Sequence, residues 1–278
     1  MPRFLPTFRD RTLLLLTACL AMFASLSGAD RARAQDTAPQ TVDLELVLAV
    51  DTSSSVSPLE FDLQMRGLAE AFRHPAVLGA IRAAGDLGIA VSLVQWSDNR
   101  NQFVAVDWMT LNEEADVLAL ADEIDKAPRF LVGGGTAIGG ALEFAARQFE
   151  RNDFEGRRKV IDLSGDGRTN QGAHPGPIRD EAVAKGITVN GLAILNEDVY
   201  VDRYYRFNVI GGTGAFVMTA ADYESFADAM LQKLVKEIAG VPVAGLPGQP
   251  GLPPGPQVGD AQVGRAQPAQ TGGAAPEM

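Results

Sequence analysis

The sequence is nearly free of cysteine and histidine. Cys19 is the single cysteine among 278 residues, and it lies in an amino-terminal segment that we predict to be removed. Without it the chain has no disulfide, no redox pair and no cysteine-held metal. His74 and His174 each precede a proline, where we expect a helix cap or a surface residue. Neither residue type therefore points to a site.

Clusters of basic residues are also missing. The net charge is −11, and residues 1–34 contain five arginines against two aspartates, so the remaining chain carries about −14. An acidic surface of this kind repels phosphate backbones and attracts divalent cations. We therefore predict no nucleic-acid partner.

The motifs of common nucleotide and hydrolase sites are absent. No G-x-G-x-x-G follows the first apolar strand, no Gly-Lys-Ser/Thr closes the glycine-rich loop, and no G-x-S-x-G occurs. Residues 162–167 resemble the start of an EF-hand loop, but position twelve is Ala173 instead of glutamate, and a strand precedes the loop. We predict that the protein is not an enzyme, with an enzyme of unknown class as the remote alternative.

The amino-terminal segment has the pattern of a cleavable export signal rather than of a membrane-spanning helix. Basic residues precede an apolar core at residues 12–26, and Ala32–Ala34 gives an A-x-A cleavage pattern. We expect residues 1–34 to be a signal peptide and the mature protein to be periplasmic or extracellular, without a membrane span. Two alternatives are an uncleaved anchor and a lipoprotein, in which Cys19 of a lipobox-like segment carries lipid.

The rest of the chain divides into a folded region and two polar or low-complexity ends. Residues 35–41 form a short polar lead-in, and residues 240–278 are rich in Pro, Gly, Ala and Gln. Such a tail buries too little apolar surface to offset its ordering entropy, so we expect it to be disordered. The globular domain then covers residues 42–239, and we expect a monomer.

Short apolar runs alternate with amphipathic segments in this domain, which predicts parallel strands joined by helices. We expect strands at residues 44–50, 87–96, 103–108, 159–163, 187–195 and 215–218, and helices at 59–73, 113–127, 137–149, 178–185, 199–207 and 223–238. The predicted fold is α/β, with a doubly wound, mostly parallel sheet, one antiparallel edge strand and helices on both faces.

Three loops at the expected carboxyl edge of this sheet carry oxygen-bearing side chains, where such folds bind ligands. The first strand leads into Asp51, Ser53 and Ser55, a glycine-rich loop leads to Thr136, and the fourth strand leads to Asp166. Two carboxylates and three hydroxyls suit a hard cation, Mg²⁺ above all, with Mn²⁺ or Ca²⁺ as substitutes. We predict one metal site formed by these five residues.

The D-x-S-x-S, Gly-Gly-Thr and Gly-Asp-Gly segments, in this order, resemble the metal-ion-dependent adhesion site (MIDAS) of von Willebrand factor type A (VWA) domains. The resemblance implies that Ser53, Ser55 and Thr136 bind the metal directly or through water. It also implies that Asp51 and Asp166 mostly hold bound waters and hydroxyls. The family more often has Thr-Asp-Gly where this chain has Ser-Gly-Asp-Gly.

The chain also resembles a group of exported bacterial VWA proteins without assigned function, through residues 94–97 and the Ser-Gly-Asp-Gly loop. The implied function is an exported, metal-dependent protein-binding module, whose ion accepts an Asp or Glu carboxylate from a partner protein. The alternative is a structural VWA domain that keeps the fold without using a metal.

Three further residues attract attention without an assigned function. Asp162 lies in a strand that we expect to be buried, where a carboxylate needs hydrogen-bond donors. We expect a structural role for it, with a partner that the sequence does not identify. Trp96 and Trp108 are expected to pack at strand ends.

The export prediction is checked at the amino terminus of the mature protein. Expression in an exporting host should give a chain that begins at Gln35, because signal peptidase cleaves after the A-x-A pattern. Mass spectrometry of the purified protein measures this. A mature chain that begins at a lipidated Cys19 would refute cleavage after Ala34.

Overall fold

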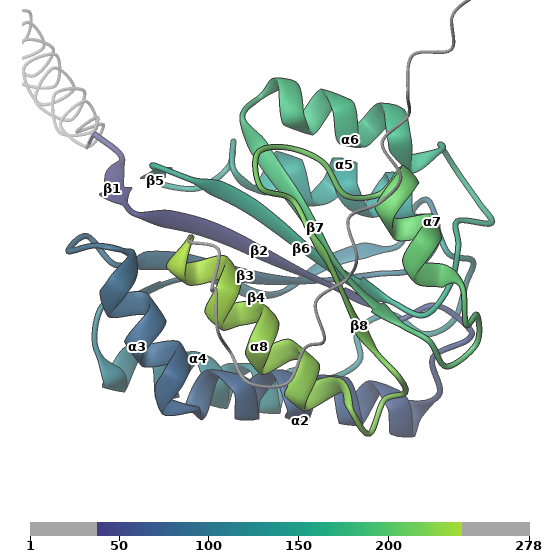
Figure 1. The fold of residues 1–278 in the computed structure, drawn as a ribbon, viewed down its shortest axis with the longest axis horizontal. Helices are drawn as coiled ribbons and strands as arrows, with labels where there is room; N and C mark the ends of the chain where they lie inside the picture. Colours follow the sequence, from purple (N-terminus) through teal and green to yellow (C-terminus); the bar gives the residue numbers. More distant parts are fainter. Residues whose placement is uncertain (1–37, 241–278) are drawn as a thin grey trace, which may run out of the picture. The chain divides into compact units, whose positions relative to one another are not determined.

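The computed structural model describes residues 38–240 (Figure 1). The predicted signal peptide, its cleavage site and the low-complexity tail from residue 241 onward lie outside the described residues. Within them, six strands form one sheet in the order β4-β3-β2-β6-β7-β8, and seven helices surround it.

The strands of the sheet are β2 (Leu44–Asp51), β3 (Ile89–Trp96), β4 (Gln102–Leu111), β6 (Lys159–Gly165), β7 (Ile187–Ile194) and β8 (Val217–Ala220). The helices are α2 (Pro58–Arg73), α3 (Pro75–Ala84), α4 (Glu114–Lys126), α5 (Ile138–Gln148), α6 (Pro175–Ala184), α7 (Val201–Asn208) and α8 (Phe226–Ala239). A separate pair of short parallel strands consists of β1 (Gln40–Val42) and β5 (Phe154–Gly156).

The central strand, β2, is buried along all eight of its residues. It pairs in parallel with β3 on one side and with β6 on the other. Its side chains alternate between two apolar cores: Leu46 and Leu48 enter one, and Val47 and Ala49 enter the other. A strand covered on both faces needs a mostly apolar sequence, and the apolar run at residues 46–50 is why this segment could be predicted.

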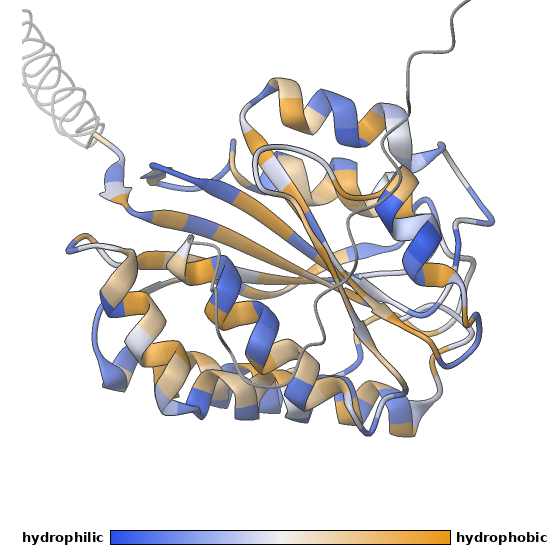
Figure 2. Cartoon of the chain, in the orientation of Figure 1, coloured by the Kyte–Doolittle hydropathy of each residue, from blue (hydrophilic) through white to orange (hydrophobic). Residues whose placement is uncertain are grey.

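The predicted sheet architecture is confirmed. β6, β7 and β8 continue the parallel sheet on one side of β2, and β4 runs antiparallel to β3 at the other edge. Helices α2, α3, α4 and α8 cover one face, and α5, α6 and α7 cover the other (Figure 1). In Figure 2 the central strands are mostly hydrophobic, whereas hydrophobic and hydrophilic residues alternate along the helices, as expected for helices with one buried side.

Three short elements were not predicted. β1 includes residues 40 and 41, which we had assigned to the polar lead-in, and it pairs with β5. Strands of three residues are too short to show a periodic pattern, so both were missed. α3 was missed because Pro75 looked like the end of α2, whereas it occupies the first turn of a second helix.

The ends of the remaining elements differ by a few residues from the prediction. α6 begins three residues early, at Pro175, and α8 begins three residues late, at Phe226. The later start of α8 has a local cause. The Ser225 N–H donates to Asp222 Oδ1 at 2.8 Å, and this forms a turn before the helix. β8 is shifted by two residues toward the carboxyl terminus.

Side chains cap three helix starts, and the start of α2 is the one that the sequence predicted. Ser57 and Glu60 form a capping box at α2, with Pro58 in the first turn. The Nδ1 atoms of His74 and His174 each accept a backbone N–H at 3.2 Å, at the starts of α3 and α6. The interpretation of both histidines as caps is confirmed.

The two tryptophans lie in neighbouring strands. Trp96 is the fully buried last residue of β3, as expected. Trp108 lies inside the longer-than-expected β4, with its ring 5.8 Å from that of Phe149 and 6.1 Å from that of Phe154. Among residues 38–240, no helix has both the length and the apolar character needed to cross a membrane.

A buried ion pair joins the sheet to α8. Asp162, in the middle of β6, has its Oδ1 2.6 Å from Lys233 Nζ, and both side chains are buried. Lys233 also contacts Glu237 Oε1 at 3.0 Å, and Asn190 donates to that same oxygen at 2.6 Å. Lys233 is thus the partner of Asp162 that the sequence did not identify, because 71 residues separate the two.

Removing the cation from this pair should strongly destabilise the domain. Lys233→Met leaves Asp162 buried without its counter-charge, so we expect the free energy of unfolding to fall by about 3–5 kcal/mol. Urea unfolding followed by circular dichroism measures it. The exposed Lys126→Met is the matched control and should change it by less than about 0.5 kcal/mol. An unchanged unfolding free energy for Lys233→Met would contradict this account.

Candidate metal centre

The carboxyl ends of β2 and β6 lie side by side where the strand order of the sheet reverses. From β2 the chain adds β3 and β4 on one side, and it then crosses to β6, β7 and β8 on the other. Crevices at such reversals are the ligand sites of doubly wound sheets. The five residues predicted to form the metal site all come together at this crevice.

Asp51 is the fully buried last residue of β2. Its Oδ1 accepts the backbone N–H of Ser53 at 2.7 Å, and its Oδ2 has no hydrogen-bond partner within residues 38–240. Gly165 makes room for this carboxylate, because an added Cβ there would lie 2.8 Å from Oδ2 and 2.7 Å from the Tyr205 hydroxyl. β2 therefore ends on a buried carboxylate oxygen with unused hydrogen-bonding capacity.

Three hydroxyls form a cluster at this strand end. The Oγ atoms of Ser53 and Ser55 are 3.3 Å apart, and Thr136 Oγ1 is 3.4 Å from Ser53 Oγ. Ser55 Oγ donates to Asp166 Oδ1 at 2.9 Å. Side chains from three loops that are distant in the sequence therefore contact one another.

Asp166 follows β6 directly and is buried. Its Oδ2 accepts a hydrogen bond from the Tyr223 hydroxyl at 3.1 Å. We had placed Tyr223 in the closing helix without assigning it to the site. Nothing in the neighbouring sequence distinguishes this tyrosine, because its contact with Asp166 depends on how α8 packs against the sheet.

The loop before α5 positions Thr136. Gly133 and Gly134 have φ angles of +72° and +98°, which favour glycine. The carbonyl of Gly134 accepts from the backbone N–H and from the Oγ of Ser54, at 3.1 and 2.8 Å. Asn170 exchanges two hydrogen bonds with the backbone of Thr136, at 2.8 and 2.9 Å. The loop is thus fixed to those after β2 and β6.

Arg129 also supports the loop after β2. Its guanidinium donates to the backbone carbonyls of Thr52 and Ser53, at 2.8 and 3.2 Å. It also lies 5.6 Å from the ring centroid of Phe61. Neither Arg129 nor Asn170 was predicted from the sequence, because an arginine or asparagine in a loop usually indicates only a solvated surface.

Burial makes ionisation of both carboxylates at the centre unfavourable. Burial, and secondly the charge of Asp166, raises the pKa of Asp51 to about 7. Burial also raises the pKa of Asp166, against the opposing hydrogen bonds from Ser55 and Tyr223. A divalent cation at this point would favour the ionised form of both groups.

The donors at the centre fit a hard divalent cation. Residues 38–240 contain no group of three or more His, Cys, Asp or Glu side chains that could hold a metal, so a metal here depends on the hydroxyls as well. A set made only of oxygen donors favours Mg²⁺, Mn²⁺ or Ca²⁺ over softer ions. Ser54 is exposed and Ser55 half-buried, which leaves the rim of the centre open to solvent.

Comparison with known protein families gives one match over most of the domain. The family model described as "Protein of unknown function (DUF1194)" matches residues 41–242. No curated protein matches the sequence.

Solved structures give further matches at low sequence identity. Proximal thread matrix protein 1 from the mussel byssus has a TM-score of 0.54 at 18% identity, covering 72% of this chain and 49% of that one. Its form with a zinc-occupied MIDAS motif has a TM-score of 0.50 at 17% identity, covering 73% and 47%. The pilus adhesin SpaC from Lactobacillus rhamnosus GG has a TM-score of 0.50 at 16% identity, covering 74% and 31%.

This chain therefore spans about half of the mussel protein and a third of the adhesin. At these identities the likeness concerns the fold. The domain has the Rossmann-like fold of VWA domains, as the sequence resemblance implied.

Neutralising Asp51 should stabilise the metal-free protein. Because folding raises the pKa of Asp51 from 3.8 to about 7, its ionisation reduces stability as the pH rises through this range. Asp51→Asn keeps an oxygen for the Ser53 N–H and removes the charge. In chelator at pH 8, we expect the free energy of unfolding to rise by about 1–3 kcal/mol, with a smaller gain at pH 5.

Chemical denaturation at both pH values measures this gain, and the exposed Asp107→Asn serves as the control. A variant that is less stable than the wild type in chelator at pH 8 would show that the Asp51 charge is already compensated within the protein.

Proposed function

This chain belongs to the DUF1194 family of proteins of unknown function, and we propose that it is an exported, metal-dependent protein-binding module of the VWA type. One divalent cation, Mg²⁺ in the first place, is bound by Ser53, Ser55 and Thr136. Asp51 and Asp166 orient its bound waters and the serine hydroxyls.

The contact cluster around Asp51 and Asp166 is the observation that carries this proposal. Two buried carboxylates with raised pKa values lie beside three hydroxyls, and Asp51 Oδ2 has no partner within residues 38–240. Isolated buried charges are costly, so such an arrangement needs either protons or a cation. A cation also uses the hydroxyls, which protonation of the carboxylates does not require.

A carboxylate of another protein is the ligand that fits such an ion. The charges of two protein carboxylates are just enough to neutralise a divalent cation, and the other protein ligands are neutral hydroxyls. The ion therefore keeps affinity for one more anionic oxygen in its coordination shell. The open rim at Ser54 and Ser55 gives a partner access. We propose that an Asp or Glu side chain of the partner completes the coordination. The zinc-occupied MIDAS of the mussel protein and the adhesin role of SpaC are consistent with this function.

The second candidate function is a structural domain that does not use a metal. The raised pKa of Asp51 leaves it partly protonated near neutral pH, so the fold itself does not require the ion. The export pattern at residues 1–34 is compatible with both candidates, and it predicts that the proposed partner lies in the periplasm or outside the cell.

Isothermal titration calorimetry with Mg²⁺, Mn²⁺ and Ca²⁺ tests the metal directly. The wild type should bind one ion per chain with a dissociation constant below about 1 mM, an affinity of at least about 4 kcal/mol. Asp51→Ala should abolish binding and leave the circular dichroism spectrum unchanged, because Asp51 is the last residue of β2 and belongs to neither apolar core. Asp107→Ala, on the exposed edge strand, is the matched control and should bind like the wild type.

Two outcomes of this titration would contradict the proposal. If the wild type binds none of the three ions at millimolar concentration, the structural domain without a metal becomes the favoured hypothesis. If Asp51→Ala binds as tightly as the wild type, the ion binds elsewhere. A pull-down from the native compartment, with and without chelator, then identifies a partner whose capture requires both the ion and Asp51.

A further inference from the structure

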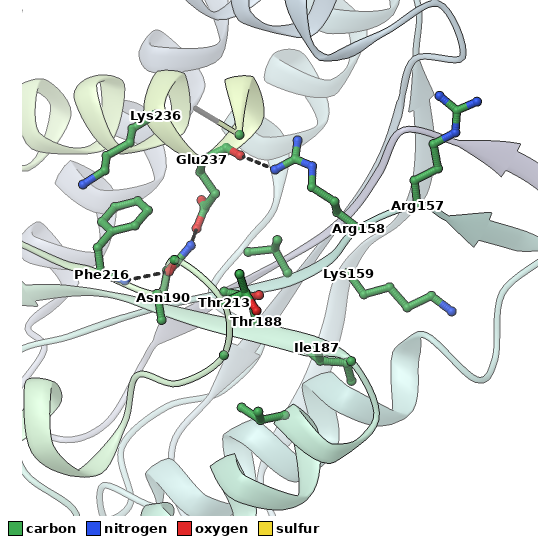
Figure 3. A pocket seen from close by; sticks show the side chains of 17 residues that line it. Arg157, Arg158, Lys159, Ile187, Thr188, Asn190, Thr213, Phe216, Lys236 and Glu237 are labelled. Carbon is green, nitrogen blue, oxygen red and sulfur yellow. Dashed lines mark hydrogen bonds between the residues drawn. The ribbon is translucent and has the colours of Figure 1, made fainter. Parts of the chain in front are cut away.

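A cavity of about 620 Å³ opens at the amino ends of β6 and β7, at the end of the sheet opposite the metal centre (Figure 3). It exists because β8 pairs with β7 only from Gly191 onward. Residues 187–190 of β7 pair with β6 on one side but have no strand beside them on the β8 side. A loop that is joined to β7 by the Val189–Gly211 bridge crosses on that side instead. The cavity lies between this loop and the end of α8.

Four cationic side chains line the cavity of this acidic protein, and two of them have carboxylate partners. Arg157 contacts Asp43 at 2.9 Å, and Lys159 lies 3.2 Å from Glu155. In Figure 3 both Arg157 and Lys159 extend away from the other lining side chains. Their charges are therefore compensated outside the cavity.

The other two cations, Arg158 and Lys236, form no ion pair within residues 38–240. Arg158 donates to the backbone carbonyls of Glu237 and Ile238, at 2.9 and 2.5 Å, and this fixes its guanidinium at the end of α8. Its pKa is lowered, mainly by burial. Lys236 Nζ lies 3.9 Å from the ring centroid of Phe216. Two cations without carboxylate partners thus line one cavity.

The wall between these cations is polar and almost fully buried. Glu237 is 3% exposed, and its Oε2 has no hydrogen-bond partner within the described residues. Burial, followed by the charge of Asp162, raises the pKa of Glu237, so this side chain repels an anion less than an ordinary glutamate does. Phe216 and Ile187 add apolar surface to the lining.

We propose that this cavity binds a small organic anion, whose charge is offset by Arg158 and Lys236 and whose apolar part lies against Phe216. The volume is within the range of small-molecule sites, which combine an apolar lining with a few fixed polar groups. An aromatic or branched aliphatic carboxylate is the class of ligand that this lining fits. The site shares no residue with the metal centre and does not depend on the function proposed for it.

The test uses 2-naphthoate as the probe, followed by ¹H–¹⁵N correlation spectra of the protein in chelator. Amide shifts should concentrate at residues 186–190, 211–216 and 236–240 and saturate at millimolar probe. The neutral 2-naphthalenemethanol, of nearly the same shape, should bind at least about fivefold more weakly, a difference of about 1 kcal/mol. Chelator removes any contribution from a metal-bound carboxylate.

Lys236→Gln should weaken 2-naphthoate binding by about fivefold or more, because it removes a charge-assisted contact and keeps a side chain of similar length. It should not change the affinity for 2-naphthalenemethanol. Lys126→Gln, on the distant α4, is the matched control and should bind like the wild type. The proposal is overturned if the shifts lie elsewhere, if the neutral probe binds equally well, or if Lys236→Gln has no effect.

Discussion

The buried carboxylates Asp51 and Asp166 impose the main electrostatic constraint on this domain. Asp51 is the last residue of β2 and Asp166 directly follows β6, and the burial of β2 along its whole length places its end in a dry environment. Ionised groups there are unfavourable without compensation. Their surroundings offer hydroxyls from Ser53, Ser55 and Thr136, together with the glycines that let the loops approach. A cation would satisfy all of these groups together, which is why the proposed function rests on this point.

Helix α8 connects this centre with the rest of the sheet. Tyr223, just before the helix, donates to Asp166. In its middle, Lys233 forms the buried ion pair with Asp162 of β6. At its end, Lys236 and the main chain around Glu237 line the cationic cavity. Along β6 the same three features come in the reverse order, with the cavity at its amino end, Asp162 in its middle and Asp166 after its last residue. The packing of one helix against one strand therefore fixes three polar features of the domain.

The sequence was sufficient to predict the fold and the five residues of the candidate site, because both depend on local patterns. Apolar strands, caps such as Ser57, and the three loop motifs are all visible within a few residues of the chain. The contributions of Lys233, Tyr223, Asn170 and Arg129 were missed for one physical reason. Each acts on a residue at least 34 positions away in the sequence, and such a contact exists only in the folded domain, where distant loops meet and α8 packs on the sheet. The short β1 and β5 were missed because three residues show no periodicity.

The most direct measurement of the central claim is a crystal structure with Mn²⁺, recorded at the manganese absorption edge. The account predicts a single anomalous peak per chain, within coordination distance of Ser53 Oγ, Ser55 Oγ and Thr136 Oγ1, about 2.2 Å for direct oxygen ligands and about 4 Å where a water intervenes. Asp51 and Asp166 should contact its waters. A peak elsewhere on the acidic surface, or no peak in crystals soaked at millimolar Mn²⁺, would contradict the account.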